Sequence, residues 1–257
     1  MTPAVERERV TTSGFFPPWI RHEHRARYVF AAQHAAGRGV IDCACSDGAY
    51  TRLLGEVASS VRGFDISADA IAGAQEQNAS QNIEYEVGDA LALPVADASA
   101  DLFVSLETLE HLPDGRAFMR EISRVLGDDG VLICSTPDRN VYSPGHAHGA
   151  VPWNRFHLHE FTRDEFRELL HEYFADVELF GQNPKLPTLV GARMLLGRIL
   201  PWNLMVRVNQ ALKLPRFLHD SPGRHAVVAA DEARRYEILV AVCGKPRLRR
   251  NPSGAGI

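Results

Sequence analysis

Three acidic residues, Asp42, Asp65 and Asp89, each follow a short apolar run, and this spacing constrains the fold more than any other feature of the chain. Short apolar runs that alternate with helical patterns predict a parallel sheet with helices on both faces. The carboxyl ends of such strands meet at one edge, where open α/β sheets bind their ligands. One acid per strand end therefore predicts a ligand with several donor groups, laid across three strands.

The alternation of patterns predicts an α/β, Rossmann-like architecture with a seven-stranded sheet. Thr162 and Glu165 form the pattern of a capping box at the start of one helix. The expected strands are 40–43, 60–64, 83–87, 101–106, 131–135, 175–180 and 236–243. The expected helices are 19–36, 48–57, 69–78, 118–126 and 162–173. The predicted divisions are an N-terminal segment with a lid helix (1–36), a core (37–183 and 235–245), a helical insertion (184–234) and a flexible tail (246–257).

The segment 184–234 interrupts the alternation of strands and helices. It is rich in Leu, Met and Val, and before residue 225 it carries seven basic residues against one acid. We expect a helical insertion over or beside the ligand edge. An additional layer of core, or a homodimer contact, is the alternative. A helix lying on a membrane surface is a third interpretation, because apolar and basic residues are mixed.

The composition excludes several classes of protein. A chain of 257 residues with 45% hydrophobic residues can fill one large domain with an elaboration. A formal net charge of -4 supplies no general field that would recruit nucleic acid. No apolar leader follows Met1 and no run of 18 apolar residues occurs. The four cysteines show no zinc pattern, and we expect reduced core thiols in a cytoplasmic protein.

The stretch Val40-Ile41-Asp42-Cys43-Ala44-Cys45-Ser46-Asp47-Gly48 follows a predicted strand and opens a helix. It resembles the Asp-x-Gly-x-Gly-x-Gly motif of class I S-adenosylmethionine-dependent methyltransferases. Asp42 and Gly48 match that motif, while Ala44 and Ser46 replace the first two glycines by small residues. The G-x-G-x-x-G pattern of nicotinamide-binding loops is absent, which argues against a dehydrogenase.

This resemblance implies that the cofactor is S-adenosylmethionine. By the family pattern, Asp65 accepts hydrogen bonds from the ribose hydroxyls and Asp89 accepts from the adenine amine. The first helix resembles the lid that closes over the cofactor in related enzymes. The cofactor-binding residues that the resemblance implies are Asp42, Ala44, Ser46, Gly48, Asp65, Ile66, Asp89, Ala90, Arg27 and Tyr28.

Two further stretches resemble one subgroup of the family. Glu107-Thr108-Leu109-Glu110-His111 looks like the Glu-x-x-Glu-His stretch of small-molecule and glycan methyltransferases. Residues 154–161 are similar to a stretch in glycan-modifying members. The resemblance implies an O-methyltransferase whose partner is a sugar, oligosaccharide or polysaccharide. A methylated-mannose polysaccharide methyltransferase is a specific candidate.

A neutral alcohol is a weak nucleophile, so a histidine base is expected near the acceptor. His146, His148, His157 and His159 crowd the loop after the fifth strand. We expect His157 to be the base or a substrate ligand, with His146 or His148 as the next candidates. For each of them, a hydrogen bond that merely holds the loop is the alternative.

The expected catalytic residues also include Glu107 and His111, which follow the fourth predicted strand. His111 could equally support other residues of the pocket. A metal held by the two His-x-His pairs with Glu107, Glu110 or Asp138 is geometrically possible. We assign no metal to the site.

Two other functions remain open at the level of sequence. A lipid-like or quinone acceptor would make the insertion 184–234 a lid that faces a membrane. A non-catalytic scaffold with a degenerate cofactor loop is motivated by Ala44 and Ser46. Nucleic acid is not expected as a partner, because the chain has neither a continuous basic groove nor an Asn-Pro-Pro-Tyr signature.

Overall fold

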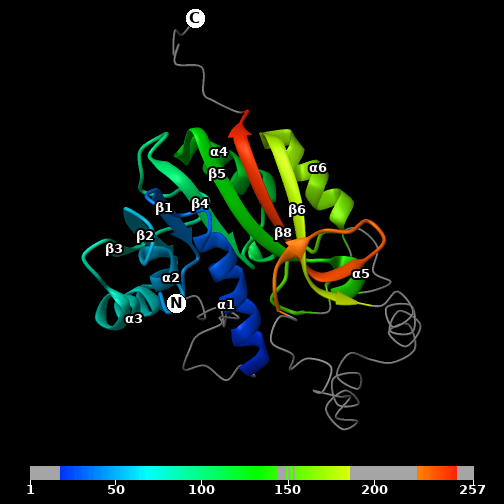
Figure 1. The fold of residues 1–257 in the computed structure, drawn as a ribbon, viewed down its shortest axis with the longest axis horizontal. Helices are drawn as coiled ribbons and strands as arrows, with labels where there is room; N and C mark the ends of the chain where they lie inside the picture. The colour runs from blue at the N-terminus through cyan, green and yellow to red at the C-terminus, as the bar shows by residue number, and fades with distance from the viewer. Residues whose placement is uncertain (1–17, 144–148, 150, 153, 186–224, 248–257) are drawn as a thin grey trace, which may run out of the picture.

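The computed structural model describes residues 18–143, 149, 151–152, 154–185 and 225–247. Its centre is a single sheet of eight strands in the order β3-β2-β1-β4-β5-β8-β6-β7 (Figure 1). The strands are β1 (Gly39–Cys43), β2 (Ser60–Asp65), β3 (Ile83–Val87), β4 (Ala100–Leu106), β5 (Leu126–Pro137), β6 (Phe174–Lys185), β7 (Val228–Ala229) and β8 (Arg235–Pro246).

The first five strands are parallel, and the chain order reverses beside β1. Strand β1 pairs with β2 on one side and with β4 on the other. Strand β8 is antiparallel to both β5 and β6. A reversal of strand order opens a crevice at the carboxyl ends of the strands, which is the usual ligand site of such sheets.

Helices cover both faces of the sheet. The described helices are α1 (Pro18–Ala32), α2 (Thr51–Gly55), α3 (Ala68–Asn78), a 3-10 turn η1 (Leu109–His111), α4 (Gly115–Val125), α5 (Arg139–Tyr142) and α6 (Arg163–Tyr173). Residues of α1, α2 and α3 share one apolar core with Val104 of β4. Residues of α4 and α6 share the other core with Phe103, which points to the opposite face. The sheet is therefore buried on both sides.

Short polar side chains begin the helices where the sequence indicates. Thr162 accepts from the backbone N–H of Glu165, whose carboxylate accepts from the N–H of Thr162, so the predicted capping box is confirmed. Ser67 caps α3 by accepting from the N–H of Ala70 at 3.3 Å. Each cap satisfies an N–H that the helix itself leaves unpaired.

The α/β architecture is confirmed, but the sheet has eight strands rather than seven. Strand β6 continues to Lys185, and β7 pairs with it through Val228 and Ala229. These residues lie in the segment 184–234, for which we expected a helical insertion. The backbone continues as strand there because Lys185 and Pro184 still find partners on β8. Residues 186–224, 1–17 and 248–257 lie outside the described residues.

Several element boundaries also differ from the expectations. Strand β5 begins at Leu126, before the expected start at residue 131, and shifts its register against β4 between Ala100 and Leu102. Helix α4 begins earlier, at Gly115, because Asp114 caps it. The first helix ends at Ala32 and α2 spans only five residues. Within the described residues, no helix is long and apolar enough to span a membrane.

Gly181 provides a test of how β6 packs against β8. A Cβ at this position would lie 2.1 Å from Cγ of the buried Tyr236 ring. We expect Gly181→Ala to lower the free energy of unfolding by about 1–3 kcal/mol, since the ring must move within a packed core. The matched control is Gly73→Ala in α3, where a Cβ meets nothing within 4 Å.

Urea titration of both variants measures the difference. The control should gain up to about 1 kcal/mol, because alanine favours the helix over glycine. Equal stability of the two variants would contradict this packing of β6 on β8.

Candidate functional site

The loop after β1 adopts the backbone of a glycine-rich loop, although two of its glycine positions hold other residues. Ala44, Ser46 and Gly48 have φ angles of 66°, 54° and 71°. L-residues rarely adopt this left-handed region, and each such residue costs about 1–2 kcal/mol relative to the right-handed form. At Gly48 a side chain is excluded outright, because a Cβ would lie 2.5 Å from the Tyr85 hydroxyl. The loop thus keeps its tight shape at an energetic cost.

Asp42 joins this loop to the two helices that flank it. Its side chain is fully buried and accepts a hydrogen bond from Thr51 Oγ1 at 2.7 Å. The hydroxyl of Tyr28 lies 3.1 and 3.2 Å from its two oxygens. Burial raises the pKa of Asp42 to about 7, and the hydrogen bonds from Thr51 and Tyr28 oppose that rise. A cationic group of a ligand would stabilise the ionised form of this buried carboxyl.

Asp65 ends β2 and holds the loop after β1 in place. Its Oδ2 accepts from the backbone N–H of Ser46 at 3.1 Å, and its Oδ1 accepts from the N–H of Ser67 at 2.8 Å. Each oxygen keeps a second lone pair, so the carboxylate can also accept from two ligand hydroxyls. The next residue, Ile66, is 47% exposed. An apolar side chain in the open at this edge is suited to a flat ring.

Asp89 lies after β3, at the same edge of the sheet. It is exposed, and its Oδ1 accepts from the backbone N–H of Leu91 at 2.9 Å. Ala90 beside it is half-buried against the core that contains Phe103. The described structure therefore brings the predicted residues of three strand ends to one edge. Their contacts with a cofactor remain predictions.

Arg27 reaches this site from the face of α1 that packs on the sheet. It is buried, donates through Nη1 to Gln182 Oε1, and has Nη2 3.1 Å from Nδ1 of His24. Its Nε makes no hydrogen bond within the described residues, and neither does the buried Oγ of Ser46. Buried polar groups are normally paired. Each of these groups could donate a hydrogen bond to an anionic group of a ligand.

The loop after β4 supplies a second, acidic part of the site. Glu107 has a φ of 56°, and its carboxylate accepts from Ser135 Oγ at 2.7 Å. Glu110 in η1 is buried and accepts from Thr136 Oγ1 at 3.1 Å. Burial raises the pKa of the Glu110 carboxyl well above its usual range, and the nearby Glu107 adds to that rise. A residue with a strained backbone and a buried carboxyl group thus lie together where β4 ends.

The segment 154–161 is bound to η1 by two backbone hydrogen bonds and one side-chain contact. The N–H groups of Leu158 and His159 donate to the carbonyl oxygen of Glu110 at 2.7 and 3.2 Å. Nδ1 of His111 lies 2.9 Å from the carbonyl oxygen of Phe156. The segment is therefore held against the end of β4 rather than extending away from it.

His157 is buried and lies beside His111. Their ring centroids are 5.0 Å apart, with the planes at 79°. Nδ1 of His157 lies 2.7 Å from Glu160 Oε1, and its Nε2 lies 2.9 Å from Asn154 Nδ2. His146 and His148 lie outside the described residues. The roles expected for these histidines stay predictions, although the structure places two of them together.

One group of described residues could hold a metal ion. Glu110, His111 and His157 each place a ligand atom within 4.8 Å of the others. Glu107, Asp138 and His159 are not members of this group. Asp138 instead caps α5 by accepting from the N–H of Asn140 at 2.9 Å. The amide of Asn154 already donates to His157, so a metal would have to displace it.

Three positioning residues have no predicted role in the sequence analysis: Asn154, Glu160 and Gln182. The first two lie in the stretch that resembles glycan-modifying enzymes, so their position could have been noticed. Gln182 is buried, and its Nε2 donates to the carbonyl oxygens of Glu23 and His225. No local pattern marks it, because its partners come from distant parts of the chain.

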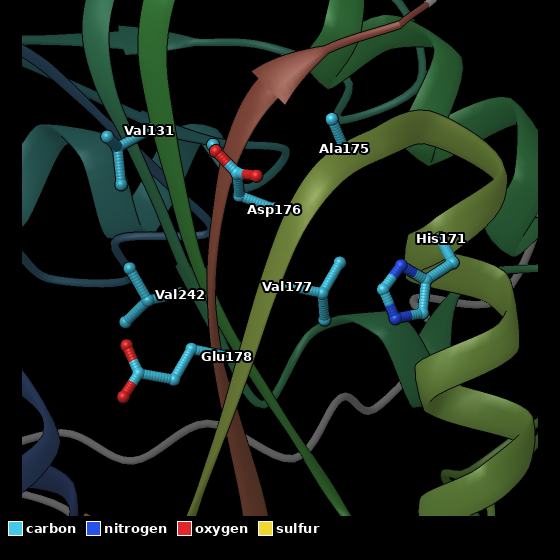
Figure 2. Close-up of a pocket in the computed structure, with 8 residues that line it drawn as sticks. Val131, His171, Ala175, Asp176, Val177, Glu178 and Val242 are labelled. Carbon is cyan, nitrogen blue, oxygen red and sulfur yellow. The ribbon is translucent and has the colours of Figure 1, made fainter.

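A surface hollow of about 530 Å³ lies beside β5, β6 and β8 (Figure 2). Val131, Val177, Val242 and Glu178 line it, together with His171 of α6. Val131 pairs with Gly244 near the amino end of β5, whereas Pro137 at the carboxyl end of the strand pairs with Ile238. The hollow is therefore separate from the edge where the strand-end acids lie.

Comparison with known proteins agrees with this geometry. Residues 41–134 match the family model described as a methyltransferase domain. A protein of Mycolicibacterium smegmatis, described as a probable S-adenosylmethionine-dependent methyltransferase, is 35% identical over 160 residues, which are 62% of this chain and 60% of that protein. The ubiquinone biosynthesis O-methyltransferase of Paraburkholderia phytofirmans is 29% identical over 122 residues, 46% of this chain and 53% of that protein.

A solved structure shows the same fold. The N-methyltransferase NodS of Bradyrhizobium japonicum, in complex with S-adenosyl-L-homocysteine, has a TM-score of 0.56 at 16% identity, covering 90% of this chain and 89% of that one. The chain spans between half and two thirds of the length of the two curated relatives above. Because the match is partial, acceptor and partners do not follow from these relatives.

Asp42 should make the free energy of unfolding of the protein without cofactor depend on pH. The folded state binds the proton of Asp42 more tightly than the unfolded chain does, since its pKa is about 7 rather than 3.8. The associated stability is fully present below about pH 4 and is lost as the pH rises through about 7. Asp42→Asn removes this titration. Between about pH 4 and pH 7, the free energy of unfolding of the variant should therefore fall less than that of the wild type, by on the order of 1–4 kcal/mol.

Urea unfolding of both proteins from pH 4 to pH 8 checks this expectation. Curves that run parallel over the whole range would show that Asp42 is ionised at no cost in the folded protein.

Proposed function

We propose that this chain is a class I S-adenosylmethionine-dependent methyltransferase, and that it methylates a hydroxyl group of a sugar or polysaccharide. One observation carries the proposal. The cofactor-type loop after β1 and the histidine–carboxylate cluster after β4 lie on adjacent strands that pair with each other. A donor held by the first would face an acceptor held by the second.

The residues of this chain would bind the cofactor and align it with the acceptor. When bound, S-adenosylmethionine supplies the methyl group and a sulfur that takes the electron pair of the broken carbon–sulfur bond. Asp42, Asp65 and Arg27 would hold its ammonium, ribose and carboxylate groups. Helix α1 contributes Tyr28 and Arg27 and so helps to exclude water. Alignment of the two reactants and exclusion of water supply most of the rate in such a displacement.

The chemistry of the acceptor end favours a sugar. Glu107, Glu110 and His111 crowd a small region after β4, and Arg27 acts on Glu110 from α1. Sugars present many hydroxyls, which charged side chains can bind by hydrogen bonds from several directions. A neutral sugar hydroxyl also needs a proton acceptor, and this region holds two histidines.

A quinol acceptor is the second candidate, and two observations favour it. A relative is a ubiquinone biosynthesis O-methyltransferase. In the segment beside the cluster, Val151 is 82% exposed and Leu158 is 51% exposed. Exposed apolar side chains near an acceptor site would suit a prenylated ring better than a sugar.

Both candidates can be compared in one assay. The purified protein is incubated with S-adenosylmethionine carrying a labelled methyl group, and with either short mannose or glucose oligosaccharides or a short-chain prenylated quinol. We expect label on an oligosaccharide hydroxyl, at a rate well above that with the quinol. Label on the quinol alone would replace the sugar proposal by the second candidate. Label on neither would contradict both.

A further inference from the structure

We propose that Gln182 of β6 is a positioning residue that aims the guanidinium of Arg27 at the carboxylate of the cofactor. The inference rests on the proposed function only for its cofactor, and it holds for any methyl acceptor. Arg27 is expected at the cofactor from the sequence, whereas no sequence pattern marks Gln182. Two features carry the inference: a buried positive charge with neutral partners, and a carboxamide with a fixed orientation.

Arg27 is a buried cation whose hydrogen-bond partners carry no charge. The residue is 4% exposed. Its Nη1 donates to Oε1 of Gln182, and its Nη2 lies 3.1 Å from Nδ1 of His24. Burial and the charge of Arg27 lower the pKa of His24 well below its usual range, so this ring is neutral and its Nδ1 accepts. Among the described residues, no carboxylate oxygen lies within 4.0 Å of the guanidinium.

The guanidinium therefore lacks a negative partner, and one of its donors is unused. Nε makes no hydrogen bond within the described residues. Two carboxyl groups lie near Arg27, but burial raises the pKa of Glu23 to about 7 and that of Glu110 well above its usual range. Both are thus partly or wholly protonated at neutral pH. Because buried charges are normally paired, the missing negative charge is one that a ligand supplies.

Arg27 lies near the carboxyl ends of β1 and β4. Its neighbour Tyr28 donates to Asp42 at the end of β1. The charge of Arg27 opposes the rise that burial causes in the pKa of Tyr50, at the start of α2, and of Glu110 in η1. In the proposed site, the amino-acid end of the cofactor lies here, with its ammonium at Asp42. The anion of that end is a carboxylate, which a guanidinium binds through charge-assisted hydrogen bonds.

Gln182 holds this guanidinium through a carboxamide whose orientation is fixed. The residue is fully buried near the end of β6. Its Nε2 donates to the backbone carbonyl oxygens of Glu23 in α1 and of His225. A carbonyl oxygen can only accept, so these contacts identify the amide nitrogen, and Oε1 accepts from Nη1 of Arg27. A rotated carboxamide would lose all three hydrogen bonds.

The neutral character of Gln182 preserves the affinity of Arg27 for an anionic ligand. A carboxylate at position 182 would pair with Arg27 and compensate its charge. The carboxamide instead accepts one hydrogen bond, fixes Nη1, and leaves the charge and Nε for the cofactor. Gln182 also joins α1 to His225, just before β7, so it holds the helix that carries Arg27 against the sheet.

The test compares the binding of S-adenosylhomocysteine with that of its decarboxylated analogue, which lacks only the carboxylate. Calorimetric titration gives the Kd of each. The wild-type protein should bind S-adenosylhomocysteine about 10- to 100-fold more tightly, the range for a hydrogen bond to a charged group. Arg27→Met should remove most of this preference, and Gln182→Met should lower it by about 3- to 30-fold. The control Gln75→Met, which removes a carboxamide that donates to the carbonyl oxygen of Tyr85, should keep it.

The affinity for the decarboxylated analogue separates the aiming of Arg27 from general damage, because a misfolded variant loses both ligands. This affinity should be unchanged in Gln182→Met. In the double variant that combines Arg27→Met with Gln182→Met, the two effects on the preference should not add, since Gln182 acts through Arg27. The inference is overturned by a wild-type preference in Gln182→Met, by additive effects, or by equal binding of both ligands to the wild-type protein.

A second variant, Gln182→Glu, keeps the shape of the side chain and serves if Gln182→Met does not fold. Its carboxylate should pair with Arg27, so the preference for S-adenosylhomocysteine should fall here too, and an unchanged preference would overturn the inference. Wild-type protein that binds neither ligand would overturn the cofactor assignment and the inference with it. Wild-type protein that shows the expected preference but methylates no hydroxyl would support the inference and count against the proposed acceptor alone.

Discussion

The buried carboxyl of Asp42 is the interaction on which the site depends. It sits at the end of β1 and receives hydroxyl hydrogen bonds from Tyr28 of α1 and Thr51 of α2. Helix α1, strand β1 and helix α2 are thereby joined at one point. Burial makes this carboxyl expensive to ionise, which the packing of both helices must offset. Such a cost is typical of a site prepared for a charged ligand.

The loop after β1 keeps the backbone conformation of a glycine-rich loop although two of the glycines of the motif are replaced. Ala44 and Ser46 hold left-handed φ angles that glycine would adopt without strain. Asp65 stabilises this shape by accepting from the N–H of Ser46. The strain is therefore balanced by a hydrogen bond from the neighbouring strand, and the loop does not need its two missing glycines to form.

Local patterns in the sequence were sufficient to predict the α/β architecture and the sheet edge at which Asp42, Asp65 and Asp89 gather. The apolar runs before Asp42, Asp65 and Asp89 predict parallel strands, because buried strands leave a continuous hydrophobic signal. The pairing of β7 with β6 was not predictable, since two residues carry no periodicity. The crowding of histidines was predictable from the sequence, but the different hydrogen-bond partners of His111 and His157 were not. That difference depends on Asn154, Glu160 and a backbone carbonyl, whose positions only the folded chain defines.

The proposed cofactor site lies at the ends of β1 and β2, and calorimetric titration with S-adenosylhomocysteine tests it most directly. The wild-type protein should bind one equivalent with saturation. Asp65→Ala should bind more weakly by about 1–3 kcal/mol, because ribose hydroxyls and the N–H of Ser46 lose their acceptor. Equal affinity in the variant, or no binding by the wild-type protein at millimolar ligand, would contradict the account.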